Sequence, residues 1–94
     1  MSYGNTKWQP WVLNEEDGIK HIKAAYDAGI NAFDTANMYS GGESEVILGK
    51  AIKQLNLPRD EIVVMTKVRG IALNKEGYYM TWLFFPGFLA GFSR

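Results

Sequence analysis

The chain has 94 residues, with ten basic and ten acidic side chains, one histidine and no cysteine. This length allows one small domain and falls well short of the roughly 200 to 250 residues of a closed eight-stranded α/β barrel. A net charge of zero gives no basic surface for nucleic acid, so we expect no nucleic-acid partner. Without cysteine, disulfides, cysteine-based zinc sites and thiol nucleophiles are excluded, and His21 alone leaves little for another metal site.

The first third of the chain predicts a helix followed by a strand. Asn14 is a good N-cap, and the three acidic residues after it suit the positive end of a helix dipole. Gly29 suits a left-handed C-terminal cap, so we expect the helix to run to about Ala28. Its apolar stripe has helical spacing: Ile19, Ile22 and Tyr26. Residues 30–33 then predict a short strand that ends at Asp34.

A second helix and a second strand follow. Ser44 is the expected N-cap of this helix, and Asn56-Leu-Pro58 ends it. The apolar positions of the helix are Leu48, Ala51, Ile52 and Leu55. Residues 62–66 are continuously apolar up to Thr66 and rich in β-branched side chains, which predicts a strand buried on both faces of a parallel sheet. The alternation of helices and strands indicates an α/β fold with right-handed crossovers.

Three side chains with chemistry follow the ends of these strands. Asp34 and Lys67 each come directly after a strand, and consecutive parallel strands are often neighbours, so we expect an Asp34–Lys67 ion pair at one rim. Tyr39 lies in the loop after Asp34 and is expected to bend back toward the pair. Carboxylate, phenol and amine together can donate a proton to a substrate carbonyl.

Four segments around these residues carry a resemblance to a known family: Phe33-Asp34-Thr-Ala-Asn-Met-Tyr39, Gly42-Glu-Ser-Glu45, Leu48-Gly-Lys-Ala-Ile52 and Val64-Met-Thr-Lys67-Val68. In combination they resemble the aldo-keto reductases, NAD(P)H-dependent enzymes built on a (β/α)8 barrel. The resemblance runs from about Ser2 to Val68, and Trp8-Gln-Pro-Trp11 is similar to the longer-loop fungal members. It implies a partial (β/α)8 barrel, with about strands two and three and their helices.

The resemblance also implies a role for each residue. Tyr39 would be the general acid that protonates the carbonyl oxygen of a small aldehyde or ketone while hydride arrives from NADPH. Lys67, paired with Asp34, would favour the phenolate, because a nearby cation stabilises an anion. The family's further histidine and its cofactor-binding residues lie beyond position 70 in the usual order and have no counterpart here. We therefore expect no cofactor-binding residue in this chain, and little or no activity from the chain alone.

The remaining residues, 70–94, match no pattern that we can name. We expect residues 1–69 to be the N-terminal part of a reductase domain and residues 70–94 to be an unmatched aromatic tail. A gene-model or splicing error would explain the change, and so would a short, non-catalytic form whose tail, Tyr78 to Phe92, binds a partner or a membrane surface. A membrane span is not expected, because the stretch is too short and Pro86-Gly87 interrupts it. We expect a cytoplasmic chain that tends to self-associate through its incomplete sheet.

Each highlighted residue also has a simpler interpretation. Asp34 can merely begin a turn, Tyr39 can be a half-buried loop aromatic, and Lys67 can be a solvated strand end. Gly41-Gly42 ahead of a helix is expected to form a turn rather than a phosphate cradle, since P-loop spacing is absent. His21 is expected to be an exposed surface residue.

Overall fold

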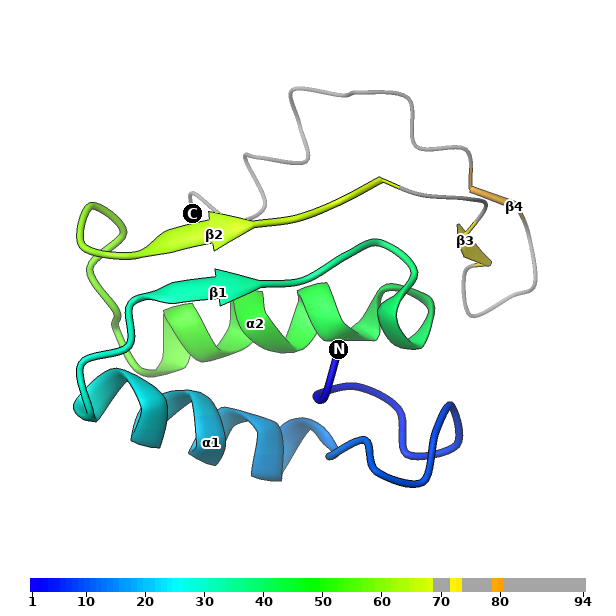
Figure 1. Cartoon of the computed structure of the whole chain (residues 1–94), viewed down its shortest axis with the longest axis horizontal. Helices are drawn as coiled ribbons and strands as arrows, with labels where there is room; N and C mark the ends of the chain where they lie inside the picture. Colours follow the sequence, from blue (N-terminus) through cyan, green and yellow to red (C-terminus); the bar gives the residue numbers. More distant parts are fainter. Residues whose placement is uncertain (69–71, 74–78, 81–94) are drawn as a thin grey trace.

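The computed structural model describes residues 1–68, 72–73 and 79–80. Two helices run side by side, and two strands lie along one side of the pair (Figure 1). The elements that carry the site are α1 (Glu15–Asp27), β1 (Ala32–Asp34), a 3-10 turn η1 (Tyr39–Gly42), α2 (Glu43–Gln54) and β2 (Val63–Met65). β1 and β2 pair in parallel, which confirms the α/β order expected from the sequence.

The ends of α1 follow the sequence signals. The side chain of Asn14 accepts a hydrogen bond from the backbone N–H of Asp17 at 2.9 Å, as an N-cap does. At the other end, Ala28 is the C-cap and Gly29 has φ +97°, a left-handed conformation that glycine adopts without steric cost. Both predicted helix boundaries are therefore confirmed.

β1 is shorter than expected and begins two residues later. Its first predicted residue, Ile30, donates its backbone N–H to the carbonyl of Ala25 at 3.0 Å, so this group belongs to the turn that closes α1. β2 (Val63–Met65) is also shorter than the strand predicted over residues 62–66. The ladder between β1 and β2 has three pairs of Cα partners, from Ala32↔Val63 to Asp34↔Met65.

The N-cap expected for α2 is wrong. Gly42, with φ +96°, is the N-cap, and Ser44 lies within the first turn of the helix. The Ser44 side chain is buried and accepts a hydrogen bond from the Thr35 hydroxyl at 3.1 Å. Its hydroxyl therefore binds the loop after β1 instead of a free backbone N–H of the helix.

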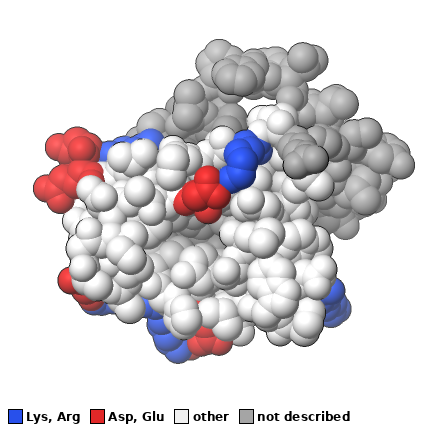
Figure 2. Space-filling view, viewed as in Figure 1, with Lys and Arg blue, Asp and Glu red and all other residues white. Residues whose placement is uncertain are grey.

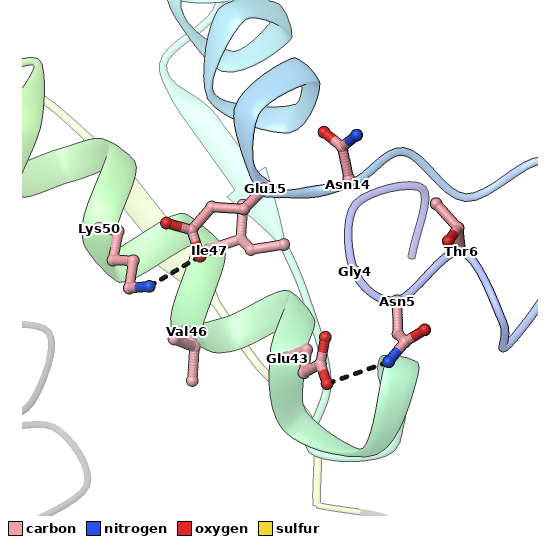
Figure 3. Close-up of a pocket in the computed structure, with 9 residues that line it drawn as sticks. All are labelled: Gly4, Asn5, Thr6, Asn14, Glu15, Glu43, Val46, Ile47 and Lys50. Carbon is pink, nitrogen blue, oxygen red and sulfur yellow. Dashed lines mark hydrogen bonds and ion pairs between the residues drawn. The ribbon is translucent and has the colours of Figure 1, made fainter.

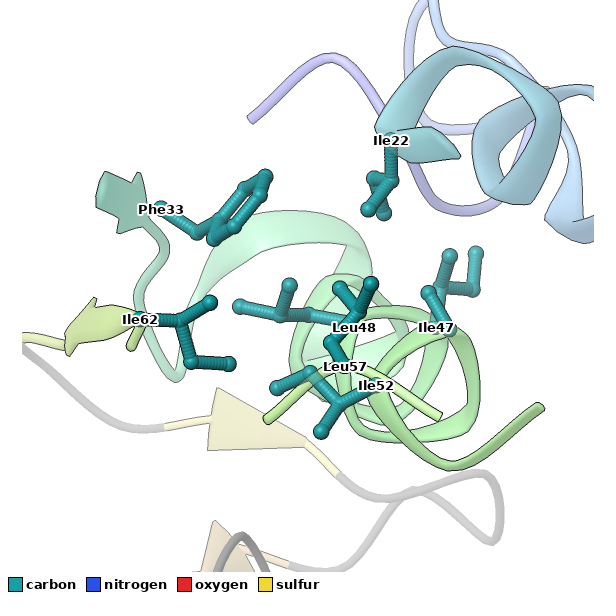
Figure 4. Packing of buried hydrophobic residues seen from close by; sticks show 8 residues of the cluster. Ile22, Phe33, Ile47, Leu48, Ile52, Leu57 and Ile62 are labelled. Carbon is teal, nitrogen blue, oxygen red and sulfur yellow. The ribbon is translucent and has the colours of Figure 1, made fainter. Parts of the chain in front are cut away.

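One apolar cluster joins the two helices to the strands (Figure 4). Its buried members are Ile22 from α1, Phe33 from β1, Ile47, Leu48, Ala51 and Ile52 from α2, and Leu57 and Ile62 before β2. Tyr3, Ile19, Tyr26, Leu55 and Val64 pack against it with partly buried side chains. The helical stripes predicted from the sequence thus form the core, because both helices turn their apolar faces to the same side of the sheet.

The opposite face of the two-stranded sheet is open within the described residues. Phe33 is only 9% exposed, whereas Val63 and Met65 are 52% and 46% exposed. The expectation of a strand buried on both faces is therefore wrong for β2. Successive strand residues point to opposite faces, and in the described part of the chain helices cover just one of them.

β3 (Ala72–Leu73) and β4 (Tyr79–Met80) form a second, antiparallel pair. The rest of the tail segment expected to bind a partner or a membrane surface, Tyr78 to Phe92, lies outside the described residues, as does most of the predicted unit 70–94.

No helix in the described ranges has the length and apolar character to cross a membrane. On the face seen in Figure 2, acidic and basic side chains form small groups, and no broad area of one charge covers the white surface.

Candidate functional site

An ion pair joins the carboxyl ends of the two parallel strands. Lys67 Nζ lies 2.6 Å from Asp34 Oδ2, so the predicted pair is confirmed as a contact. Asp34 is the last residue of β1, and Lys67 follows β2 by two residues. The side chains are 53% and 48% exposed, so the pair lies at the rim and not in the core.

Backbone hydrogen bonds hold the segments after the strands side by side. The Thr35 N–H donates to the carbonyl of Met65 at 2.8 Å, and the Asn37 N–H donates to the carbonyl of Lys67 at 3.0 Å. The ammonium of Lys67 also donates to the carbonyl of Thr35 at 3.0 Å. Lys67 is thus fixed through its side chain and its main chain to the segment that follows Asp34.

Tyr39 returns to this rim from η1, as expected. Its ring centroid lies 5.3 Å from Lys67 Nζ, within the range of a cation–π contact. The indole of Trp8 lies 6.3 Å from the same ring, centroid to centroid, and the indole of Trp11 lies 6.1 Å from that of Trp8. Tyr39 is half-buried and contacts both a cation and an indole, whereas Trp8 and Trp11 are themselves exposed.

The charge state of Lys67 follows from these contacts. Its hydrogen bond to Asp34 raises the pKa of Lys67 above the ordinary value of 10.5, and the nearby Tyr39 acts in the same direction. The ammonium therefore remains protonated at neutral pH. A permanent cation beside a phenol can stabilise negative charge on the phenol oxygen or on a bound substrate oxygen.

The described residues at this rim do not suit the two phosphates of the dinucleotide that the family resemblance implies. Two phosphates need cations or an uncompensated helix N-terminus. In the described part of the chain, the side-chain cation at this rim is Lys67, and its charge is paired with Asp34. The nearby N-terminus of α2 carries the carboxylate of Glu43, which repels phosphate.

Sequence reasoning missed a buried polar link next to Lys67. Thr66 donates its hydroxyl to Glu45 Oε1, and Glu45 is only 8% exposed. Burial raises the pKa of Glu45, and the hydrogen bond from Thr66 partly opposes that rise. The sequence offered one indication of this contact, because Glu45 belongs to the Gly42–Glu45 motif. Only the fold shows that β2 ends beside Glu45.

A cavity of about 270 Å³ lies away from the Asp34–Lys67 pair, among the N-terminal segment, the start of α1 and the first turns of α2 (Figure 3). Its charged side chains already have partners. Lys50 pairs with Glu15 at 2.7 Å, and Asn5 donates to Glu43 at 3.3 Å.

His21, exposed as expected on α1, makes an edge contact with the ring of Tyr3. Among the described residues, no cluster of three or more His, Asp or Glu side chains could hold a metal ion.

The chain is similar to proteins of one known family. A family model described as the aldo/keto reductase family matches residues 1–83, which is further along the chain than the motifs expected to carry the resemblance. An aldo-keto reductase of Fusarium vanettenii is 51% identical over 78 residues, covering 83% of this chain and 21% of that protein. The aldo-keto reductase AFTS1 of Alternaria alternata is 57% identical over 67 residues, covering 71% and 18%. The versiconal hemiacetal acetate reductase of Aspergillus parasiticus is 54% identical over 67 residues, covering 71% and 20%.

The chain thus spans about a fifth of the length of these relatives. With the parallel β1–β2 pair and its two helices, the family match confirms the expected fold class, part of an α/β barrel. The expected boundary after residue 69 stays a prediction, since residues 69–71 are not among the described ones.

Proposed function

Because this chain belongs to the aldo/keto reductase family, we propose that Asp34, Tyr39 and Lys67 form the proton-donating part of an NAD(P)H-dependent site that reduces small aldehydes or ketones to alcohols. The observation that carries the proposal is the contact set at the rim. Lys67 lies 2.6 Å from Asp34 and 5.3 Å from the ring centroid of Tyr39. Asp34 and Tyr39, from the segment after β1, thus meet Lys67, which lies 33 residues beyond Asp34, at the kind of rim where catalytic residues of α/β barrels lie.

In this proposal each residue has a distinct role. The hydroxyl of Tyr39 donates a hydrogen bond to the substrate carbonyl oxygen and transfers its proton as the alcohol forms. Lys67 stabilises the negative charge that is left on the phenol oxygen. Asp34 fixes Lys67 in place and keeps it charged through their hydrogen bond. A reduced nicotinamide would supply the hydride that the carbonyl carbon receives.

NADPH is the proposed hydride donor, but the described residues do not supply its phosphate site. We therefore propose that the 94-residue chain alone does not turn over carbonyl compounds. Its catalytic groups would act only together with residues that bind the cofactor, and holding both reactants in place supplies a large share of such rate enhancement.

A chimera tests the proposal. Residues 1–68 would replace the aligned segment of the Fusarium vanettenii relative, and NADPH consumption would be measured with a panel of aldehydes. We expect the chimera to be active, the free chain to be inactive, and Tyr39→Phe to lower kcat by about 10²- to 10⁴-fold, the usual contribution of a general acid.

Tyr26→Phe is the matched control, because it removes a tyrosine hydroxyl from α1, where the hydroxyl bonds to Glu61 and not to the rim. It should leave kcat within about twofold, since surface changes away from the site are usually small. An active chimera in which Tyr39→Phe and Tyr26→Phe behave alike would exclude the proposed general acid.

A further inference from the structure

The loop that carries Tyr39 has an unusual backbone. Ser40 has φ 52° and ψ 37°, a left-handed conformation that costs energy in any residue other than glycine. The residue is only 6% exposed, and its Oγ has no hydrogen-bond partner among the described residues. A strained residue with a buried, unbonded hydroxyl persists only where its surroundings hold it in place.

The surroundings are the backbone of Gly4. A Cβ added at Gly4 would lie 2.0 Å from Ser40 Oγ and 2.5 Å from Ser40 Cβ. Apart from atoms of the same residue and its chain neighbours, heavy atoms essentially never lie within 3.0 Å of a real Cβ. The Ser40 side chain therefore fills the space that any side chain at position 4 would take, and the missing Cβ of Gly4 is what admits it.

Gly4 is itself firmly placed. Its N–H donates to the carbonyl of Leu13 at 2.8 Å, and the Leu13 N–H donates to the carbonyl of Ser2 at 2.8 Å. These two bonds form a parallel bridge centred on Tyr3 and Leu13. The position of Gly4 is thus fixed by the segment just before α1, independently of the Tyr39 loop.

The same N-terminal segment meets the loop at two further points. Asn5 donates to the side chain of Glu43, the residue that follows η1, at 3.3 Å. The indole of Trp8 lies 6.3 Å from the ring of Tyr39. Residues 4–8 therefore contact Ser40, the start of α2 and the Tyr39 ring, and Ser40 is joined directly to Tyr39 by a peptide bond.

We propose that Gly4 is a positioning residue: by admitting the Ser40 side chain against its backbone, it locks the left-handed turn that presents the Tyr39 phenol to Lys67. The inference rests on the proposed role of Tyr39 as the general acid. A side chain at position 4 would push Ser40 and its neighbour away from the rim, while the apolar cluster under the sheet would stay packed.

Nuclear magnetic resonance of the 94-residue chain tests the placement without any assay of activity. In the unaltered chain we expect nuclear Overhauser contacts between the Tyr39 ring and the Lys67 side chain. Gly4→Ala should abolish these contacts and keep those between Phe33 and Val64 in the core. Gly29→Ala is the control, because a Cβ there meets nothing within 4 Å and brings only backbone strain at φ +97°. It should preserve the Tyr39–Lys67 contacts.

Second-site variants separate positioning from general loss of stability. Gly4→Ala with Ser40→Gly removes both clashing atoms and should restore the Tyr39–Lys67 contacts. Gly4→Ala with Ser40→Ala keeps the Cβ that would lie at 2.5 Å, so it should not restore them. If Gly4→Ala alone unfolds the chain, recovery by Ser40→Gly but not by Ser40→Ala supports the proposal. Retained contacts in Gly4→Ala, or equal recovery in both double variants, would overturn it.

The chimera supplies the catalytic readout. Misplacing a reacting group by about 1 Å costs about 10²-fold, so Gly4→Ala should lower kcat by about that factor with KM within about twofold, and Ser40→Gly should recover most of the loss. A KM effect with unchanged kcat would contradict positioning of the acid. If Tyr39→Phe is silent in the chimera, the proposed function fails, while the magnetic resonance contacts still decide the role of Gly4.

Discussion

The helix-covered side of the β1–β2 sheet and the rim at the carboxyl ends of its strands are built in different ways. On the covered side, eight buried apolar residues from both helices and both strand regions pack together. At the rim, Asp34 and Lys67 are about half exposed and are joined by polar contacts. The loop next to them includes a left-handed serine.

This difference in construction suggests that one region stabilises the fold and that the other carries the chemistry. Burial of apolar area is the main stabilising term of a small domain, whereas exposed ion pairs contribute little. The covered side should therefore set whether the chain folds, and the rim should set what the folded chain can do. Substitutions on the covered side should therefore change stability strongly. Substitutions at the rim should change stability little.

The largest expected effect on stability is from Ile22→Ala. Ile22 is 1% exposed and lies between the helices and the sheet, so its truncation leaves a cavity. We expect a loss of about 2–5 kcal/mol in the free energy of unfolding, measured by urea denaturation of the chain. Ile30→Ala is the control, because Ile30 is 53% exposed and its truncation opens no cavity. Equal losses would mean that the apolar cluster does not hold the fold.

A smaller effect is expected at the start of α1. Asn14→Ala removes the acceptor for the Asp17 N–H and should cost about 1 kcal/mol, the usual value for an N-cap. Asn14→Asp keeps an acceptor at the same place and should lose much less. The same urea titration measures both variants. An undiminished stability in Asn14→Ala would show that the cap bond is not formed in solution.

Glu45→Gln sharpens the comparison through pH, because Glu45 lies where the covered side meets the rim. Burial raises the pKa of Glu45, so the native state binds this proton more tightly than the unfolded state does. Its contribution to stability therefore falls as the pH rises from the ordinary value of 4.5 through the raised value. Glutamine does not titrate, and its oxygen can still accept from Thr66.

Urea midpoints at several pH values between 4 and 7 test this expectation. The variant should gain stability relative to the unaltered chain as the pH rises, and the two curves should meet at the acidic end. Parallel curves over the whole range would mean that Glu45 does not titrate differently in the folded and unfolded states.

The smallest expected effect on stability is from Lys67→Met. The side chains of the pair with Asp34 are about half exposed, and exposed ion pairs contribute little to stability. We expect an unchanged urea midpoint in the free chain, equal to that of the control Lys20→Met, whose lysine pairs with Glu16 on the surface of α1. In the chimera, however, Lys67→Met should lower kcat markedly and Lys20→Met should not. A large loss of stability in Lys67→Met would mean that the Asp34–Lys67 pair helps to hold the fold.

Much of the covered side and of the rim was predictable from the sequence, because local patterns determine both. Asn14 and Gly29 mark the ends of α1, and the spacing of Ile19, Ile22 and Tyr26 marks the face that packs. The Asp34–Lys67 contact followed from two strands that end at the same edge of a parallel sheet. These inferences need only short-range chemistry and the rule that neighbouring parallel strands align.

Other features required the assembled structure. Ser44 was expected to cap α2, but the hydroxyl of Thr35 reaches it and Gly42 takes the cap position. The exposure of Val63 and Met65 depends on how many layers cover the sheet, which a run of apolar residues does not specify. The Glu45–Thr66 bond likewise joins residues 21 positions apart.

By itself, the sequence determined the helices, the order of the parallel strands, the family and the three residues of the rim, because caps, periodicity and motifs are local properties of the chain. Only the tertiary structure decided which face of the sheet is covered and how Tyr39 is presented to Lys67. The fit of Ser40 against the bare backbone of Gly4 brings together residues far apart in sequence, and such close packing depends on distances that no local pattern encodes.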